Sequence, residues 1–282
     1  MAKDNWTGER LEPFIKGEVT IEHLHRYASV LNLVRDKVVL DIACGEGYGS
    51  NLMADYAKRV IGVDMADKVI SDASQKYCKP NLGFVVGDAA QIPLPDNSVE
   101  VIISFETLEH HTKHQEMFKE IIRVLKRDGF MIMSSPDKES FLDHHCKGYV
   151  NIYHVKELTT QEFKSLVEGY FSNVTYYKQK TVIGSLIVPE DGVGEFQSFS
   201  GTFDNIQFQK GLCNGLYNLC LASNTAMFSF PSGFFDGKEI ILEGCYKQRL
   251  RKTAFYRYGY PFLYILVRLK KIIDRLLINN IN

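Results

Sequence analysis

The chain has 282 residues, of which 45% are hydrophobic and 24% charged, and its formal net charge is −1. This composition is that of an ordinary soluble globular protein, and the length allows one large domain with an elaboration. The longest apolar run, Tyr260 to Val267, is far shorter than the roughly 20 residues that span a bilayer. The polar start MAKDNWTGER excludes a secretory signal, and no nucleic-acid-binding module is visible, so we expect a cytoplasmic protein without a nucleic-acid partner.

Apolar periodicity predicts an alternation of helices and strands along most of the chain. The predicted helices cover residues 20–34, 48–57, 67–77, 115–125 and 158–167. The predicted strands cover residues 38–43, 60–64, 83–86, 99–105, 130–135, 173–179 and 216–223. This rhythm predicts an α/β fold with a Rossmann-like, doubly wound sheet and helices on both faces. Because right-handed crossovers place the carboxyl ends of parallel strands on one edge, we expect the ligand site there.

A glycine-rich segment follows the first predicted strand and reads Asp41-Ile-Ala-Cys-Gly45-Glu-Gly47-Tyr-Gly49. Glycines let the backbone approach a ligand closely and leave main-chain N–H groups free at the start of a helix. The spacing is GxGxG, whereas dinucleotide sites have GxGxxG, and this difference disfavours an NAD dehydrogenase. Asp41 lies four positions before the first glycine, where a carboxylate can bind an amino or sulfonium group at close range.

Acidic residues also follow the next two predicted strands. Asp64 ends the segment VIGVD, where a carboxylate can accept hydrogen bonds from both hydroxyls of a ribose; a helix N-cap is the alternative. Asp88, in Gly87-Asp-Ala89, can accept from the exocyclic amine of an adenine, and Ala89 offers its main-chain N–H; a turn aspartate is the alternative. Together with Asp41, these residues indicate a nucleoside ligand that carries a positive charge.

Residues 38 to about 179 resemble the class I S-adenosylmethionine (SAM)-dependent methyltransferases. VLDIACGEGYGS is similar to the family's first motif, VIGVD to its second, GDAAQIPLP to its third and ISFETLEHH to its fourth. The resemblance implies a seven-stranded sheet whose last strand is antiparallel and lies between strands five and six. It also implies that SAM is contacted by Asp41, Ala43, Gly45, Gly47, Asp64, Met65, Asp88, Ala89 and Phe105.

A narrower resemblance involves the N-terminus. Residues 7–27, from Thr7-Gly-Glu-Arg10 to His25-Arg26-Tyr27, are similar to a segment of methyltransferases associated with bacterial surface-polysaccharide assembly (O-antigen and capsule). The stretch LCLASNTAMFSFPSG is similar to their last strand and its exit. This resemblance implies a saccharide or lipid-linked saccharide acceptor, and it places Arg26 and Tyr27 over the SAM site. A helix that merely packs on the sheet is the alternative for these two residues.

Two glutamates and two histidines follow the fourth predicted strand, in the segment Glu106-Thr-Leu-Glu109-His110-His111. An alcohol acceptor must lose a proton, and histidine is a natural base near neutral pH, so His110, His111 and His154 are candidate bases. The ExxEH spacing also resembles quinone-biosynthesis O-methyltransferases and small-RNA 2′-O-methyltransferases. That resemblance implies a divalent cation such as Mg²⁺ or Mn²⁺ on Glu106, Glu109, His110 and His154. In the metal-free alternative, Glu109 and His110 only bond to the main chain.

The chain divides into five predicted parts. They are an N-terminal cap segment (1–35), a SAM-binding core (36–182), an inserted lid (183–214), the end of the core (215–245) and a basic amphipathic tail (246–282). Residues 245–282 contain nine Lys or Arg residues and one acidic residue, Asp274. An apolar face beside a basic stripe is typical of a helix lying in a lipid headgroup layer, at the inner face of the membrane. Docking on the body, or on a twin subunit of a homo-oligomer, is the alternative.

The function that these patterns predict is a SAM-dependent O-methyltransferase that acts on a sugar hydroxyl of a bacterial surface glycan or its precursor. Two alternatives stay open. The first is an O-methyltransferase for a small quinone-like or aromatic metabolite, which shares the ExxEH spacing and needs a narrow acceptor pocket. The second is a non-catalytic scaffold protein with the SAM-binding fold.

Overall fold

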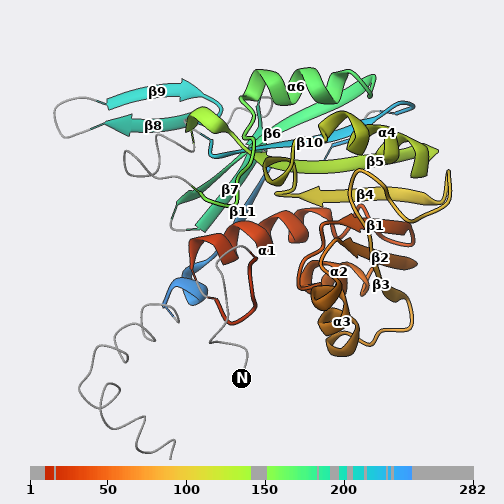
Figure 1. Ribbon diagram of the computed structural model, residues 1–282. Helices are drawn as coiled ribbons and strands as arrows, with labels where there is room; N and C mark the ends of the chain where they lie inside the picture. Colours follow the sequence, from red (N-terminus) through yellow and green to blue (C-terminus); the bar gives the residue numbers. More distant parts are fainter. Residues whose placement is uncertain are drawn as a thin grey trace, which may run out of the picture. The chain divides into compact units, whose positions relative to one another are not determined.

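The computed structural model describes residues 10–15, 17–140, 151–182, 184–190, 197–201, 206–212, 215–226, 228–229 and 232–242 (Figure 1). The predicted tail at 246–282 lies outside the described residues. The chain forms two compact units, residues 1–237 and residues 238–282. The described part of the second unit, residues 238–242, is helical.

A nine-stranded mixed sheet organises the first unit (Figure 1). Its strands are β1 (Val38–Ile42), β2 (Arg59–Asp64), β3 (Leu82–Val86), β4 (Val99–Phe105), β5 (Leu125–Pro136), β6 (Asn173–Val182), β7 (Gly184–Pro189), β10 (Tyr217–Ser223) and β11 (Gly233–Phe235). Their spatial order is β11-β7-β6-β10-β5-β4-β1-β2-β3. Strands β1 to β5 pair in parallel, and β10 pairs antiparallel with both β5 and β6. The predicted α/β fold and the antiparallel strand between β5 and β6 are therefore confirmed.

The sheet is two strands wider than the predicted seven. Strand β6 continues to Val182 and turns back into β7, which pairs antiparallel with it, and β11 pairs with β7. The first part of the predicted lid is therefore sheet, and β8 (Gln197–Gly201) and β9 (Ile206–Lys210) form a separate two-stranded ribbon. Ser185 and Ile187 are both fully buried, so β7 lacks the polar–apolar contrast that sequence periodicity detects.

Helices cover both faces of the sheet (Figure 1). They are α1 (Glu18–Val30), α2 (Tyr48–Met53), α3 (Asp67–Lys76), α4 (His114–Val124) and α6 (Thr160–Glu168), with a 3-10 turn η1 (Leu108–His110). Apolar residues of α4 and α6 pack on one face, and those of α1 and α2 pack on the other. Helices α1 and α2 end earlier than predicted, at Val30 and Met53. After Met53 the chain continues as tighter turns, such as the bond from Tyr56 N–H to the Met53 carbonyl.

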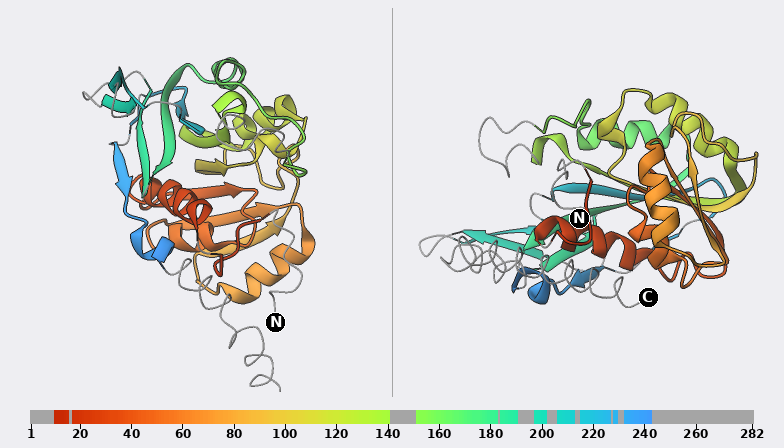
Figure 2. Two further views of the ribbon diagram at one scale, coloured as in Figure 1. Left: turned by 90° about the vertical axis from the view of Figure 1, so that its left-hand side faces the viewer. Right: turned by 60° about the horizontal axis from the view of Figure 1, so that its bottom comes forward.

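The order of the strands sets the place of the ligand site. Connections after β1 lead toward β3 and those after β4 lead toward β5, so the direction of winding reverses between β1 and β4. In open α/β sheets, ligands bind outside the carboxyl ends of the strands at such a switch point. Helix α1 lies beside this edge and also runs along β7 and β11 (Figure 2). Within the described ranges, no helix is long and apolar enough to cross a bilayer.

Candidate active site

Asp41 lies near the carboxyl end of β1 and is 1% exposed. Ser50 Oγ donates to Asp41 Oδ2 at 2.6 Å, and the Tyr27 hydroxyl lies 3.4 Å from both carboxylate oxygens. Burial raises the pKa of Asp41 to about 7, although the hydrogen bonds from Ser50 and Tyr27 act in the opposite direction. Among the described residues Asp41 has no cationic partner, so this buried carboxylate suits the positively charged ligand that the sequence predicts.

The main chain is left-handed at four residues next to this carboxylate. The φ angle is 54° at Ala43, 52° at Gly45, 82° at Gly47 and 54° at Glu106. Residues other than glycine rarely adopt this conformation, and such residues gather at functional sites. At Gly47 a Cβ atom would lie 2.8 Å from the Phe84 ring, so only glycine fits there. Because β1 and β4 are neighbours, these residues line the switch point of the sheet.

Asp64 lies at the end of β2 and joins two loops. Its Oδ2 accepts from the Gly45 N–H at 3.0 Å, and its Oδ1 accepts from the Ala66 N–H at 2.9 Å. The guanidinium of Arg10 lies 3.6 Å from Oδ1, a contact that the sequence did not predict. Asp64 is thus held against the glycine loop, where a ribose is expected, and Met65 beside it is 73% exposed.

Asp88 occupies the loop after β3 and is accessible. Its Oδ1 accepts from the Ala90 N–H at 2.8 Å, and Lys113 Nζ donates to Oδ2 at 3.2 Å. The hydrogen bond from Ala90 and the charge of Lys113 hold the pKa of Asp88 below its usual range. This edge thus presents an ionised acceptor with the half-buried Ala89 beside it, and the contact to an adenine amine stays a prediction.

Tyr27 and Phe105 pack together beside Asp41. Their rings meet edge to face with centroids 5.2 Å apart, and both side chains are buried. A Cβ atom at Gly49 would lie 1.9 Å from the Tyr27 ring, so this glycine lets α2 approach α1. Tyr27 therefore lies beside Asp41 and Phe105, two of the residues predicted to contact SAM.

Arg26, a residue of α1, is the centre of a buried polar network between this helix and the sheet. Its Nη1 donates to Gln179 Oε1 at 2.8 Å, and its guanidinium lies 4.8 Å from the centre of the Tyr217 ring. The Tyr217 hydroxyl donates to Glu22 at 2.6 Å, and Thr181 donates to the same carboxylate. Sequence reasoning missed these four partners of the network, because isolated polar residues on α1, β6 and β10 produce no periodic signal.

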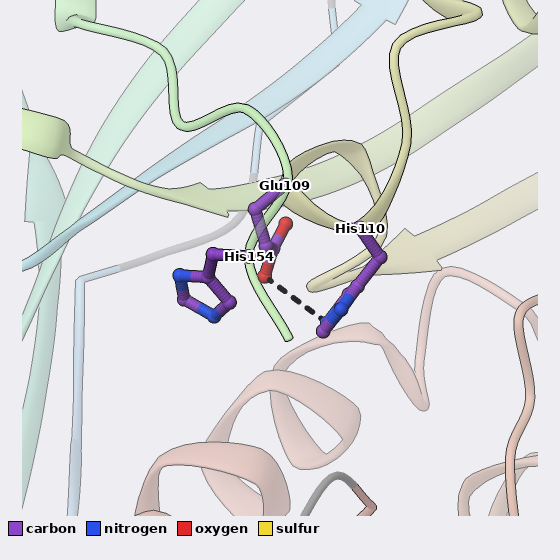
Figure 3. A group of neighbouring side chains, drawn as sticks. All are labelled: Glu109, His110 and His154. Carbon is purple, nitrogen blue, oxygen red and sulfur yellow. Dashed lines mark ion pairs between the residues drawn. The ribbon is translucent and has the colours of Figure 1, made fainter. Parts of the chain in front are cut away.

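Glu109, His110 and His154 come together next to the end of β4 (Figure 3). One potential ligand atom from each lies within 4.8 Å of the others. Glu109 is 1% exposed, its Oε2 is a buried atom without a hydrogen-bond partner among the described residues, and its Oε1 lies 3.9 Å from His110 Nε2. Burial and the nearby Glu106 raise the pKa of Glu109 well above its ordinary value.

This group has the donor set that a divalent cation requires. Two imidazoles and a carboxylate suit several divalent ions, and the unpartnered Glu109 oxygen is buried at the position where a ligand atom is needed. The three residues therefore fit a cation. The predicted fourth ligand does not join them: Glu106 Oε1 accepts from Ser134 Oγ at 2.6 Å and lies beside Arg26. Because η1 turns the chain directly after Glu106, the two glutamates have different partners.

The three candidate bases, too, do not all lie in one group. The rings of His110 and His154 lie edge to face with centroids 5.4 Å apart. The ring of His111 instead packs on His114 at 5.3 Å, and its Nδ1 accepts from the Lys113 N–H at 3.2 Å. Only His110 and His154 therefore share the group that contains Glu109.

Comparison with known proteins identifies the central part of the chain. Residues 40–133 match the family model described as a methyltransferase domain. This segment therefore has the sequence pattern of a methyltransferase domain. The matched residues include β1, the glycine loop, Asp64, Asp88 and the Glu106–His111 segment, which carry the predicted contacts to SAM.

Two mycobacterial relatives and one solved structure extend this comparison. A probable SAM-dependent methyltransferase of Mycolicibacterium smegmatis is 35% identical over 171 residues, which cover 57% of this chain and 63% of that protein. Another, from Mycobacterium tuberculosis, is 31% identical over 163 residues, covering 57% and 58%. The chain thus spans about six-tenths of the length of these relatives. A SAM-dependent methyltransferase from Thermotoga maritima has the same fold, with a TM-score of 0.53 at 18% identity over 73% of this chain and 90% of that one.

Proposed function

We propose that the protein transfers the methyl group of SAM to a hydroxyl oxygen, and that the acceptor is a sugar hydroxyl of a bacterial surface glycan or its precursor. The observation that supports a hydroxyl acceptor is the group of Glu109, His110 and His154 at the carboxyl edge of the sheet (Figure 3). A hydroxyl must lose its proton when it is methylated, and this group contains the bases that can accept it.

Each part of the site has a separate task in this proposal. When bound, SAM supplies an electrophilic methyl carbon on a positively charged sulfur. Asp41 offers the opposite charge, and Asp64 with the glycine loop would hold the ribose side. His110 Nδ1 lies 3.0 Å from the carbonyl oxygen of Tyr153, which can only accept, so the ring proton is on Nδ1. His110 Nε2 therefore carries the lone pair that can take the acceptor's proton.

A divalent cation is part of the proposal. Glu109, His110 and His154 are the residues that would hold it, and its chemistry would be that of a Lewis acid that lowers the pKa of the acceptor hydroxyl. Without the cation, His110 remains as the base, because His154 Nε2 already accepts from Asn151 Nδ2. The two versions therefore differ in their response to a chelator.

The glycan acceptor is supported by the sequence alone. Residues 7–27 resemble the N-terminal segment of methyltransferases associated with surface-polysaccharide assembly. The second candidate acceptor, a quinone-like or aromatic metabolite, is supported by a different observation. Ile152 is 81% exposed and Val155 is 63% exposed, and both lie within two positions of His154 in the chain, so apolar side chains are accessible in this segment.

Transfer of label from methyl-labelled SAM into fractions of a bacterial cell extract tests these candidates. With the full chain and Mg²⁺, we expect label in lipid-linked or polymeric glycan, recovered as an O-methyl sugar after acid hydrolysis. Label confined to small organic-soluble metabolites would favour the second candidate and contradict the first. Loss of label with EDTA, restored by Mg²⁺ or Mn²⁺, would support the cation, whereas full activity in EDTA would exclude it. An Asp64→Ala variant is the control for transfer that does not depend on this protein.

A further inference from the structure

We propose that Glu157 is a positioning residue for methyl transfer, which holds His154 in the tautomer that carries its proton on Nδ1. The main-chain carbonyl of Tyr153 does the same for His110. The catalytic consequence rests on the proposed function, whereas the tautomers themselves can be measured without it.

The contacts of His154 set its tautomer from both sides. His154 Nδ1 lies 2.5 Å from Glu157 Oε1, and a carboxylate oxygen accepts, so Nδ1 must donate. On the other side of the ring, Asn151 Nδ2 lies 2.8 Å from His154 Nε2. Asn151 Oδ1 accepts from the Tyr153 N–H at 3.1 Å, which orients the amide so that its NH₂ group faces the histidine. Both neighbours therefore require the proton on Nδ1 and the lone pair on Nε2.

The contact between Glu157 and His154 is shielded from water. The side chain of His154 is 11% exposed and that of Glu157 is 16% exposed. A charge-assisted hydrogen bond in such surroundings is stronger than one at the surface, and it orients the ring as well as selecting the tautomer. Glu157 thus decides which ring nitrogen of His154 keeps its lone pair, although it does not contact Nε2.

One short segment carries the whole arrangement. Residues 151–157 supply Asn151, the Tyr153 carbonyl, His154 and Glu157. The N–H groups of Val155 and Lys156 both donate to the Glu109 carbonyl, at 2.7 and 3.1 Å. The segment is therefore bonded to η1, the element that carries Glu109 and His110. Two histidines from different parts of the chain reach one site with the same tautomer because a single segment orients both.

Nuclear magnetic resonance of the full chain labelled with ¹⁵N-histidine tests the tautomer. We expect His154, assigned from a His154→Gln variant, to show Nδ1 as the protonated nitrogen, with its proton shifted strongly downfield by the carboxylate. That proton signal should disappear in Glu157→Ala and remain in Glu162→Ala. Glu162 is a matched control because its carboxylate bonds to Thr159 at the start of α6 and contacts neither histidine. Finding the proton on Nε2 in the wild type would overturn the proposal.

Kinetics test the catalytic consequence. Glu157→Ala should lower kcat about 10- to 100-fold with the KM for SAM unchanged, as for other residues that orient an active-site histidine. Glu157→Gln, whose amide oxygen still accepts, should restore part of kcat. Equal kcat in the wild type and Glu157→Ala would overturn the positioning role. If instead no hydroxyl acceptor is methylated by the wild type, the proposed function fails, and the resonance experiment still decides the tautomer.

Discussion

The guanidinium Nη1 of Arg26 lies 3.6 Å from Oε1 of Glu106, and this contact joins helix α1 to the end of β4. Burial alone would lower the pKa of Arg26, but the charges of Glu106, Tyr217 and Glu22 outweigh it, and the pKa is raised above its ordinary value. The side chain of Arg26 is 1% exposed. Arg26 is therefore a cation that balances the buried carboxylate of Glu22 and the partly buried carboxylate of Glu106 next to the candidate active site.

Replacement of Arg26 should destabilise the protein strongly. In Arg26→Met, the carboxylates of Glu22 and Glu106 lose their shared positive partner, and breaking a buried ion pair in this way costs about 3–5 kcal/mol. Urea unfolding measures the loss. Arg35→Met is the control, because Arg35 is exposed and stacks on Tyr56; it should change stability by no more than about 0.5 kcal/mol. Equal effects of the two variants would contradict the role of Arg26.

The affinity for SAM should rise with pH through the titration of Asp41. The pKa of Asp41 is raised to about 7 by burial, so the carboxyl group is mostly neutral at lower pH and charged at higher pH. Only the charged form attracts the positive ligand, so binding at about pH 6 should be roughly tenfold weaker than at about pH 8. Calorimetry over this range measures it. Asp41→Asn should bind weakly with no such dependence, and an unchanged pH profile in this variant would assign the titration to another group.

Loss of the Asp64 carboxylate should remove SAM binding. Asp64→Ala deletes the acceptor expected for the ribose hydroxyls and also releases the N–H groups of Gly45 and Ala66. Two hydrogen bonds to a charged acceptor correspond to at least about 100-fold in affinity. Calorimetry with SAM measures the change, and Asp67→Ala, an exposed aspartate in the first turn of α3, is the control. Unchanged affinity of Asp64→Ala would contradict the cofactor assignment.

A single methyl group at Gly49 should disturb the packing of α1 on α2. In Gly49→Ala the new Cβ would lie 1.9 Å from the Tyr27 ring, so Tyr27 must move away from Asp41. Overpacking of this kind costs about 1–3 kcal/mol, and we expect weaker SAM binding as well. In Gly83→Ala no atom lies within 4 Å of the new Cβ, so this control should leave both thermal stability and affinity near the wild-type values.

Two neighbouring histidines should differ in their effect on catalysis. His110→Gln removes a base from the group with Glu109 and His154, and kcat should fall by about 10² to 10⁴, with the dissociation constant of SAM unchanged. His111→Gln should lose less, because the ring of His111 faces His114 and Lys113. Single-turnover rates with the acceptor found in extracts measure both, and the reverse order would assign the base to His111.

Local patterns in the sequence were sufficient for the core of the fold. The strand boundaries at β1, β2 and β4 agree with prediction to within one residue, because buried strands ended by glycine or acidic residues are visible in a short window. The strand β7 was not predicted. It buries Ser185 as a hydrogen-bond partner of His25 and Gln179, so its sequence lacks an apolar pattern.

In the candidate site, too, some features could be predicted from the sequence and others could not. The sequence by itself determined the fold class, the glycine loop after Asp41 and the ends of the strands that carry Asp64 and Asp88, because these depend on neighbours along the chain. Only the tertiary structure decided the partners: Glu106 accepts from Ser134 and faces Arg26, outside the group of Glu109, His110 and His154, and Glu157 bonds to His154. Such choices depend on which buried polar atoms meet across helices and strands distant in sequence, and burial then requires that each find a partner.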